Sequence, residues 1–382
     1  MAYRSPWMTE ELDIFRDALR RFVAAELTPH AERWREQKMP DRDAWKAAGR
    51  FGMLCPSIPE AYGGAGGSFA HEAVVAEELE YGDVTGLAVA TTVHSAIVAH
   101  YLLAYGSEEQ KRRWLPKMAS GEWVGAIAMT EPGGGSDLQS LRTRATRRGN
   151  AYVLNGQKTF ITNGQLADLV IVAAKTDPAQ GARGISLFVV EAGSDGFRRG
   201  RNLDKIGLHG SDTAELFFDD LLVPPENLLG GEEGRGFYQM MEQLPQERLG
   251  LAVGAVAAME RALALTTDYV KARQAFGKPL IEFQNTAFRL AERKTEAHIA
   301  RVFLDHCIER LIARDLDGVT ASMAKWWTSE KQFETVDECL QLHGGYGYMS
   351  EFPIARMFVD ARVQKIYGGA NEIMKVLIAR SL

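Results

Sequence analysis

The spacing of apolar residues changes twice along this chain, and this change constrains the fold more than any other feature. Up to about residue 120, apolar side chains recur with the spacing of one helix face. Between about residues 124 and 225 they form short runs separated by turn signals such as Asn155-Gly156. Helical spacing then returns. We therefore expect an α+β protein with an N-terminal helical domain (1–121), a middle β-sandwich or barrel domain (122–229) and a C-terminal four-helix bundle domain (230–382).

The same patterns place individual elements. Expected helices cover residues 9–27, 72–81, 86–105, 237–273, 284–314, 320–342 and 370–382. Expected strands cover residues 125–130, 142–147, 151–154, 169–173, 185–191 and 214–218. Ser107 and Gln110 have the spacing of a capping box, which predicts a helix start there. The glycine-rich stretch 62–68 lacks the Lys-Ser/Thr ending of a phosphate-binding P-loop, so we interpret it as an ordinary loop.

Composition excludes several classes of function. The 382 residues carry a net charge of −6 and no polybasic run, which argues against nucleic acid as a main partner. The three cysteines are scattered and form no CxxC pair, as in a protein with free thiols in a reducing compartment. We find no charged-then-apolar leader and no run of about 18 apolar residues. The sequence therefore predicts a cytoplasmic protein without a membrane span.

Motifs for common chemistries are absent. No metal-ligand cluster, HExxH, GxSxG or Walker A motif occurs, so no metal site is expected, and His94 and His100 are interpreted as structural. The loop 131–137 follows a strand pattern but lacks GxGxxG, which disfavours a Rossmann nucleotide site. Its backbone N–H groups, with the hydroxyls of Thr130 and Ser136, suit a phosphate or a flavin ring edge. A plain hairpin loop explains the same residues.

A second glycine-rich stretch lies near the C-terminus. Gly368 and Gly369 are adjacent, which lets the backbone approach something flat or small. Asn371 is a candidate N-cap of the last helix, which would leave free backbone N–H groups at that helix start. A simple turn before a helix explains the same pattern.

Glu247 has an unusual setting for a carboxylate. Its neighbours along a helix are mostly small or apolar, namely Gln243, Leu244, Gly250, Leu251 and Gly254. We therefore expect its side chain to face a pocket or the core, where burial raises the pKa of a carboxyl and strengthens it as a base. Pro245 is expected to start or kink the helix beside it.

Several motifs together resemble the acyl-CoA dehydrogenase family. They occur in the family's order along the whole chain, and comprise residues 129–137, 155–164, 273–279, 341–348, 360–369 and 378–380. The stretch 244–248 together with 367–369 is most similar to the long-chain type. The helix–β–helix order of the chain agrees with the fold of that family.

The resemblance implies that the cofactor is FAD. Residues of the middle domain are expected to line the isoalloxazine ring, with the Thr162 hydroxyl at N5: Ala126, Ile127, Ala128, Met129, Thr130, Gly135, Phe160, Ile161 and Thr162. Residues of the C-terminal domain match positions that bind the rest of FAD, partly from a neighbouring subunit: Arg273, Phe276, Gln284, Gln341, Gly344, Gly345, Ala370 and Glu372. Ala370 stands where the family usually has Thr. A homo-oligomer follows, either a tetramer or a dimer.

The resemblance also implies the reaction. It is the α,β-dehydrogenation of an acyl-CoA thioester to the trans-2-enoyl-CoA, with electrons passed to an electron-transfer flavoprotein. Six residues match substrate-contact positions: Ser136, Arg183, Tyr238, Arg248, Gly368 and Gly369. Many members carry the catalytic base at the position of Gly368, whereas the isovaleryl-CoA and long-chain types carry it on the helix of Glu247. We therefore expect Glu247 to take the α-proton while the β-hydride moves to flavin N5.

Three alternatives stay open at this point. A flavin oxidase on the same fold would release hydrogen peroxide in air. A dehydrogenase of carrier-protein-bound acyl groups would need a docking surface. A catalytically dead FAD-binding scaffold would explain the missing carboxylate at Gly368. The acyl chain length is not determined by sequence, because the residues that shape such a pocket are scattered over several helices.

Overall fold

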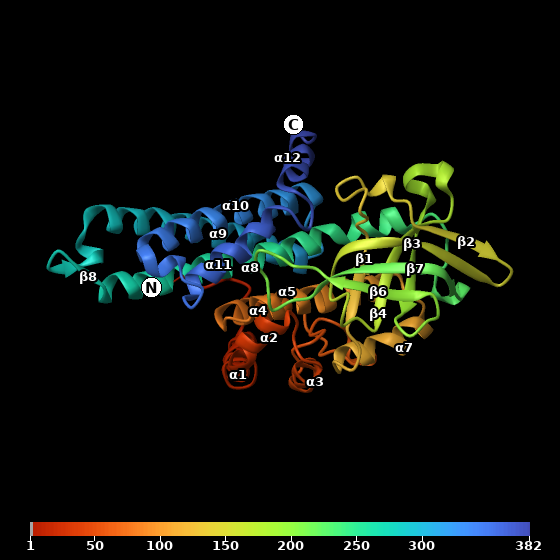
Figure 1. The fold of residues 1–382 in the computed structure, drawn as a ribbon, viewed down its shortest axis with the longest axis horizontal. Helices are drawn as coiled ribbons and strands as arrows, with labels where there is room; N and C mark the ends of the chain where they lie inside the picture. The colour runs from red at the N-terminus through yellow and green to blue at the C-terminus, as the bar shows by residue number, and fades with distance from the viewer. Residues whose placement is uncertain (1–2) are drawn as a thin grey trace.

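In the computed structural model, residues 3–382 form three successive regions (Figure 1). The first contains α1 (Glu10–Phe22), α2 (Ala31–Gln37), α3 (Arg42–Phe51), α4 (Phe69–Tyr81), α5 (Thr85–Thr91), α6 (Ala99–Tyr105) and α7 (Glu108–Ala119). Two π-helical segments, η1 (Val23–Leu27) and η4 (Thr92–Val98), continue α1 and join α5 to α6. The expected helices 9–27, 72–81 and 86–105 are therefore confirmed.

Two local predictions for this region are also confirmed. The Ser107 hydroxyl accepts the Gln110 N–H, and the Gln110 side chain accepts the Ser107 N–H, so the capping box before α7 is complete. The stretch 62–68 is a loop that follows the short 3₁₀ turn η3 (Glu60–Tyr62).

The middle region is one seven-stranded sheet, bent into a half-barrel (Figure 1). Its strands are β1 (Gly125–Ala128), β2 (Arg144–Arg148), β3 (Ala151–Thr162), β4 (Leu169–Lys175), β5 (Ile185–Glu191), β6 (Phe197–Asn202) and β7 (Thr213–Val223). The order is β1-β4-β2-β3-β7-β6, with β5 paired to β4. Strands β1 and β4 are parallel, whereas the long strands β3 and β7 are antiparallel.

Strand β3 is longer than its sequence pattern predicted. It continues through Asn155-Gly156, where we expected a turn, and its pairing with β7 shifts register between Leu154 and Gly156. Asn155 Nδ2 donates to Asp220 Oδ1 across this irregularity at 3.0 Å. The two residues therefore form a bulge within a continuous strand, and the predicted strand end at Leu154 is wrong.

The C-terminal region contains α8 (Gly236–Ala272), α9 (Gln284–Ile312), α10 (Gly318–His343), α11 (Pro353–Ala361) and α12 (Asn371–Ala379), with a small hairpin of β8 (Gln274–Ala275) and β9 (Lys278–Pro279). Helix α10 packs against α8, α9 and α11, and these helices together form the expected bundle. Helix α11 also contacts α8. The expected last helix, α12, contacts α10 and projects from the bundle (Figure 1).

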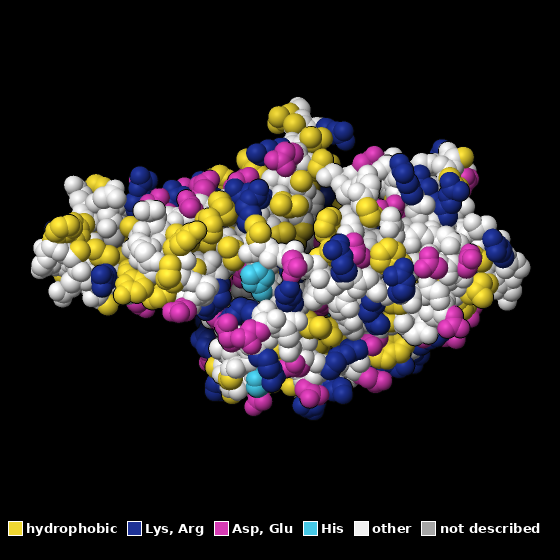
Figure 2. Space-filling model, in the orientation of Figure 1, with side chains coloured by type: hydrophobic (Ala, Val, Ile, Leu, Met, Phe, Trp, Pro, Cys, Tyr) yellow, Lys and Arg dark blue, Asp and Glu magenta, His cyan; other side chains and the backbone are white. Residues whose placement is uncertain are grey.

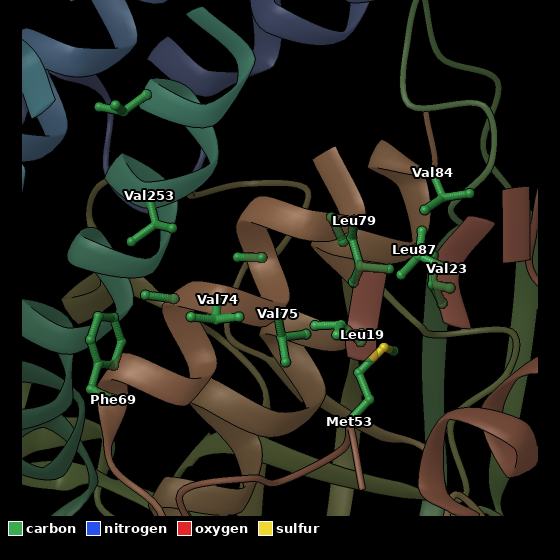
Figure 3. Packing of buried hydrophobic residues seen from close by; sticks show 14 of the residues in the cluster. Leu19, Val23, Met53, Phe69, Val74, Val75, Leu79, Val84, Leu87 and Val253 are labelled. Atoms are coloured by element: carbon green, nitrogen blue, oxygen red, sulfur yellow. The ribbon is translucent and has the colours of Figure 1, made fainter. Parts of the chain in front are cut away.

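Helix α8 connects the regions of the molecule. It runs unbroken through Pro245, so of the two effects expected of this proline, starting or kinking the helix, the first does not occur. Val253 of α8 packs in one buried cluster with Phe69 and Val74 of α4 (Figure 3). Burying an aliphatic or aromatic side chain of this size contributes roughly 1.5–3 kcal/mol. This packing fixes α8 relative to the N-terminal region.

Two helical stretches pass a simple test of length and composition for crossing a membrane. They are Thr85–Tyr105 and Gly236–Ala272, each with a mean hydropathy of 1.5 over its most apolar window. In the fold, 67% and 61% of these windows are buried inside the protein. Core helices meet the same criteria, and both stretches are core helices here.

Candidate active site

Glu247 lies in the first third of α8 and is only 7% exposed. Its Oε1 accepts a hydrogen bond from the Tyr101 hydroxyl of α6 at 2.9 Å. Burial raises the pKa of Glu247 to about 7, although the Tyr101 hydrogen bond and the charge of Arg248 oppose that rise. The expectation that this side chain faces the interior is confirmed. A carboxyl with such a pKa can accept a proton near neutral pH.

Gly368 lies directly against the helix that carries Glu247. Its φ is +62°, and a Cβ built on it would lie 2.2 Å from Cδ1 of Leu251. Leu251 follows Glu247 by one helical turn, so α8 fills the space that a side chain at position 368 would need. No hydrogen bond within residues 3–382 occupies the Gly368 N–H. The loop therefore presents a free donor beside α8, at the level of Leu251.

A buried lysine holds this loop in place. Lys325 of α10 is 1% exposed, and its Nζ donates to Gly369 O at 2.7 Å and to Asn371 Oδ1 at 2.8 Å. Burial lowers the pKa of Lys325 to about 8. Asn371 uses its side chain to bind α10, and the N-cap position of α12 is Ala370. The prediction that Asn371 caps this helix is therefore wrong.

A cavity opens beside the next turn of α8, between α4 and η4. Its walls include Phe69, Glu72, Ala73, Ala76, Thr91, Thr92, Ala96, Gly250 and Val253. The hydroxyls of Thr91 and Thr92 bond to Leu87 O and Ala88 O of the preceding turn, so they do not serve the cavity. Apart from Glu72 and Ser95, the rest of the walls is thus mostly apolar and suits a hydrocarbon chain.

The residues expected to line a flavin ring come together at β1 and β3. The Thr159 N–H donates to Thr130 O at 3.0 Å, which joins the segment after β1 to the end of β3. A register shift between Lys158 and Ile161 forms a bulge, where Phe160 has a φ of +59° and is 68% exposed. A large ring left uncovered beside a strand fits stacking on a planar aromatic group. The residues present here therefore fit FAD.

A buried ion pair between Lys158 and Glu131 holds the residues expected around the flavin ring in place. The Lys158 side chain is fully buried, and its Nζ donates to Glu131 Oε1 at 2.9 Å and to Met129 O at 3.0 Å. The Glu131 carboxylate also accepts the backbone N–H groups of Arg142 and Thr143. The base of the glycine-rich loop is thereby fixed to β3, while Gly135 and Ser136 at its tip are exposed.

Apart from Ala370 and Glu372 at the start of α12, the other expected FAD residues lie at the opposite end of the molecule. Arg273 precedes the β8–β9 hairpin, Phe276 lies in its turn and Gln284 begins α9 after it. Figure 1 shows this hairpin at the far end from β1 and β3. The segment 341–345 joins them, because the Arg273 guanidinium lies over the Tyr346 ring and Tyr269 stacks on His343. Phe276 is 96% exposed. One chain therefore does not bring the two groups together.

The expected substrate residues also lie in two separate places. A Cβ on Gly234 would lie 2.3 Å from Arg183 O, so the loop of Arg183 packs against the segment that leads into Tyr238. The segment Leu138–Ser140, just after Ser136, contacts the same loop. Arg248 lies elsewhere: it is buried, and its Nη1 donates to Ser322 Oγ on α10 at 3.1 Å.

Sequence reasoning missed three residues that shape the site, namely Tyr101, Lys158 and Lys325. Each is buried and bonds to a group distant in sequence. A π-helical segment at 92–98 was also missed, although such segments are frequent at functional sites. His94 is buried, accepts the Gly125 N–H and is structural as expected. The structure groups no set of three potential metal ligands within residues 3–382.

Comparisons with known proteins agree with this arrangement. Three family models match: the N-terminal, middle and C-terminal domains of acyl-CoA dehydrogenase, over residues 9–122, 126–221 and 234–382. The long-chain specific acyl-CoA dehydrogenase of Sus scrofa mitochondria is 50% identical over 98% of this chain and 87% of its own length. The isovaleryl-CoA dehydrogenase of Solanum tuberosum mitochondria is 38% identical over 96% and 89%.

Solved structures give the same result. An acyl-CoA dehydrogenase from Geobacillus kaustophilus superposes with a TM-score of 0.97 at 50% identity, covering 99% of both chains. A glutaryl-CoA dehydrogenase from Mycobacterium smegmatis in complex with FADH2 gives 0.92 at 30% identity, covering 98% and 95%. A structure described as the electron transferring flavoprotein of Acidaminococcus fermentans gives 0.95 at 36% identity, covering 100% and 99%. This chain belongs to the acyl-CoA dehydrogenase family.

Proposed function

We propose that this protein catalyses the FAD-dependent α,β-dehydrogenation of an acyl-CoA thioester, with Glu247 as the base that takes the α-proton. Membership of the family makes it a flavoprotein oxidoreductase. The observation that carries the assignment of the base is the position of Glu247. It is a buried carboxyl one helical turn from Leu251, whose side chain stands where a residue at 368 would place its Cβ.

The residues around Glu247 have distinct tasks in this proposal. The free Gly368 N–H binds the thioester carbonyl, which polarises the carbonyl and acidifies the neighbouring α-carbon. Glu247 then takes the α-proton; it lies on α8 one helical turn before Gly250, which lines the cavity. When bound, FAD supplies the acceptor for the β-hydrogen. The apolar walls between α4, η4 and α8 hold the acyl chain and exclude water from the carboxylate.

FAD is held between subunits of a homo-oligomer, a tetramer or a dimer. Residues 126–130, 135 and 160–162 of one subunit would hold the flavin ring, and Arg273, Phe276, Gln284 and 341–345, partly from a neighbouring subunit, would hold the rest of FAD. Ala370 and Glu372 complete the set. Support comes from the separation of the two groups along the molecule, and from the hydrophobic side chains exposed on the C-terminal helices (Figure 2), such as Phe288 and Ile299.

The remaining assignments follow from the same family. Ser136, Arg183 and Tyr238 bind the CoA part at the junction of the sheet and α8, and electrons pass to an electron-transfer flavoprotein. The relatives are mitochondrial and bacterial proteins, and we assign this chain to the cytoplasm. Domain boundaries at 121/122 and 229/230 are supported by the starts of β1 and α8.

An anaerobic titration tests this function. The FAD-loaded protein is mixed with short, branched and long acyl-CoAs while the visible flavin absorbance is followed. Bleaching by at least one acyl-CoA, with formation of the 2-enoyl product, is the expected result. No bleaching by any thioester would contradict the proposal and favour a scaffold. Rapid peroxide formation in air would indicate an oxidase, and bleaching only by carrier-protein thioesters would indicate a different substrate carrier.

A further inference from the structure

We propose that Tyr101 is a positioning residue that keeps the Glu247 carboxylate ionised and aimed during the reaction. This inference rests on the proposed function, because it assigns a partner to the base proposed there. Tyr101 lies on α6, 146 positions from Glu247 in the sequence. It touches the base and not the reacting atoms, so its effect on the reaction passes through Glu247.

Tyr101 is the hydrogen-bond donor to one oxygen of the Glu247 carboxylate. Its hydroxyl donates to Glu247 Oε1 at 2.9 Å, and this is the one hydrogen bond that the Glu247 side chain makes within residues 3–382. Both side chains are buried, Tyr101 completely. Because Oε1 is tied to Tyr101, Oε2 is the oxygen left free to meet the α-proton. A hydrogen bond donated to the charged form favours that form.

The Tyr101 hydroxyl stays protonated, and so remains a donor, at every pH near neutrality. Burial raises the pKa of this phenol well above its ordinary value, with the nearby Glu247 charge as a further cause. The bond therefore persists on both sides of neutral pH. Its strength depends on the carboxylate charge, since a donor binds a charged acceptor more strongly than a neutral one.

The charged and titratable groups around the carboxylate are few. Arg248 on α8 favours ionisation of Glu247, and Lys325 of α10 lies beside Arg248. Tyr105 lies one turn after Tyr101 on α6, with its ring edge-on to Tyr101 at 6.1 Å. The Tyr105 hydroxyl donates to the exposed Glu242 at 2.8 Å and does not bond Glu247.

These neighbours provide a matched control. Tyr101→Phe removes the hydroxyl that donates to Glu247, whereas Tyr105→Phe removes an equivalent hydroxyl that donates to Glu242. Both hydroxyls lie between α6 and α8. Both variants are made in the full-length FAD-loaded protein. The readout is the pH dependence of flavin reduction by an acyl-CoA that bleaches the wild type. In Tyr101→Phe the acid limb is expected to move upward by about one pH unit, because a hydrogen bond to a charged group is lost.

Tyr105→Phe is expected to leave the acid limb in place. An unchanged limb in Tyr101→Phe, or an equal move in both variants, would overturn the inference. Replacing Tyr101 by 3-fluorotyrosine tests the same idea without removing any packing group: a stronger donor should move the limb downward, and no movement contradicts the inference. Full flavin reduction by the Glu247→Gln variant would instead defeat the proposed base itself, so the two failures are distinguishable.

Discussion

Replacing Glu247 by Gln is expected to stabilise the fold at alkaline pH while it removes the base. The pKa of Glu247 is raised from 4.5 to about 7 in the folded protein, because burial penalises its charged form. The folded state therefore binds this proton more tightly than the unfolded chain. Below about pH 4.5 the carboxyl is protonated in both states and costs nothing. Between pH 4.5 and 7 the folded wild type loses stability as pH rises, and above pH 7 the loss is complete.

The size of this loss follows from the pKa. A move from 4.5 to about 7 corresponds to a loss of roughly 3 kcal/mol. Glutamine has nearly the same shape, keeps an oxygen for the Tyr101 hydroxyl and carries no charge. The variant should therefore melt a few degrees above the wild type at pH 8.

The assay is thermal unfolding at saturating FAD from pH 5 to pH 8, compared between wild type and Glu247→Gln. The gap between the two is expected to be small at pH 5 and to widen steadily to pH 8. Glu242→Gln changes an exposed carboxylate on the same helix and serves as the control. A gap that is independent of pH, or a variant that is less stable at pH 8, would refute the reasoning.

Three further results are expected. Flavin reduction by acyl-CoA should rise with pH through an acid limb near pH 7, since the free Glu247 carboxylate is the active form and its pKa is about 7; a limb near pH 4.5 would contradict this. Adding Gly368→Glu to Glu247→Gln should not restore reduction, because position 368 has a φ of +62° and its Cβ would meet Leu251; recovery measured by stopped flow would show that the loop can adapt. Lys158→Met should cost about 3–5 kcal/mol of stability and weaken FAD retention, since it leaves the buried Glu131 charge without its cation. Denaturant unfolding measures the stability and flavin release measures the retention; no change in either would show that the ion pair is unimportant.

The order of the three regions could be predicted because it depends on local spacing of apolar residues. The setting of Glu247 could be predicted for the same reason, since small and apolar neighbours on its own helix identify a buried face. The strand end at Leu154 could not, because Asn155-Gly156 is a common turn signal and only pairing with β7 turns it into a bulge.

The side chains that bond to Glu247 and to the glycine loop could not be predicted from the sequence, for a different reason. Tyr101 meets Glu247, and Lys325 meets Gly369, only after helices distant in sequence have packed together. Asn371 shows the same limit: its position suggested a cap, but tertiary contacts with Lys325 use its side chain instead. Local rules therefore predicted the buried setting of Glu247 and the close-packed glycine loop, whereas the groups that hold them depend on packing between α6, α8 and α10.

One measurement tests the central claim most directly. Glu247→Gln, loaded with FAD, is mixed anaerobically with an acyl-CoA that bleaches the wild type, and the flavin absorbance is followed in a stopped-flow instrument. We predict that the variant keeps its FAD and binds the acyl-CoA, but that the flavin stays oxidised, because the carboxylate that takes the α-proton has been removed. Bleaching of the variant at a rate close to that of the wild type would show that the base is not Glu247.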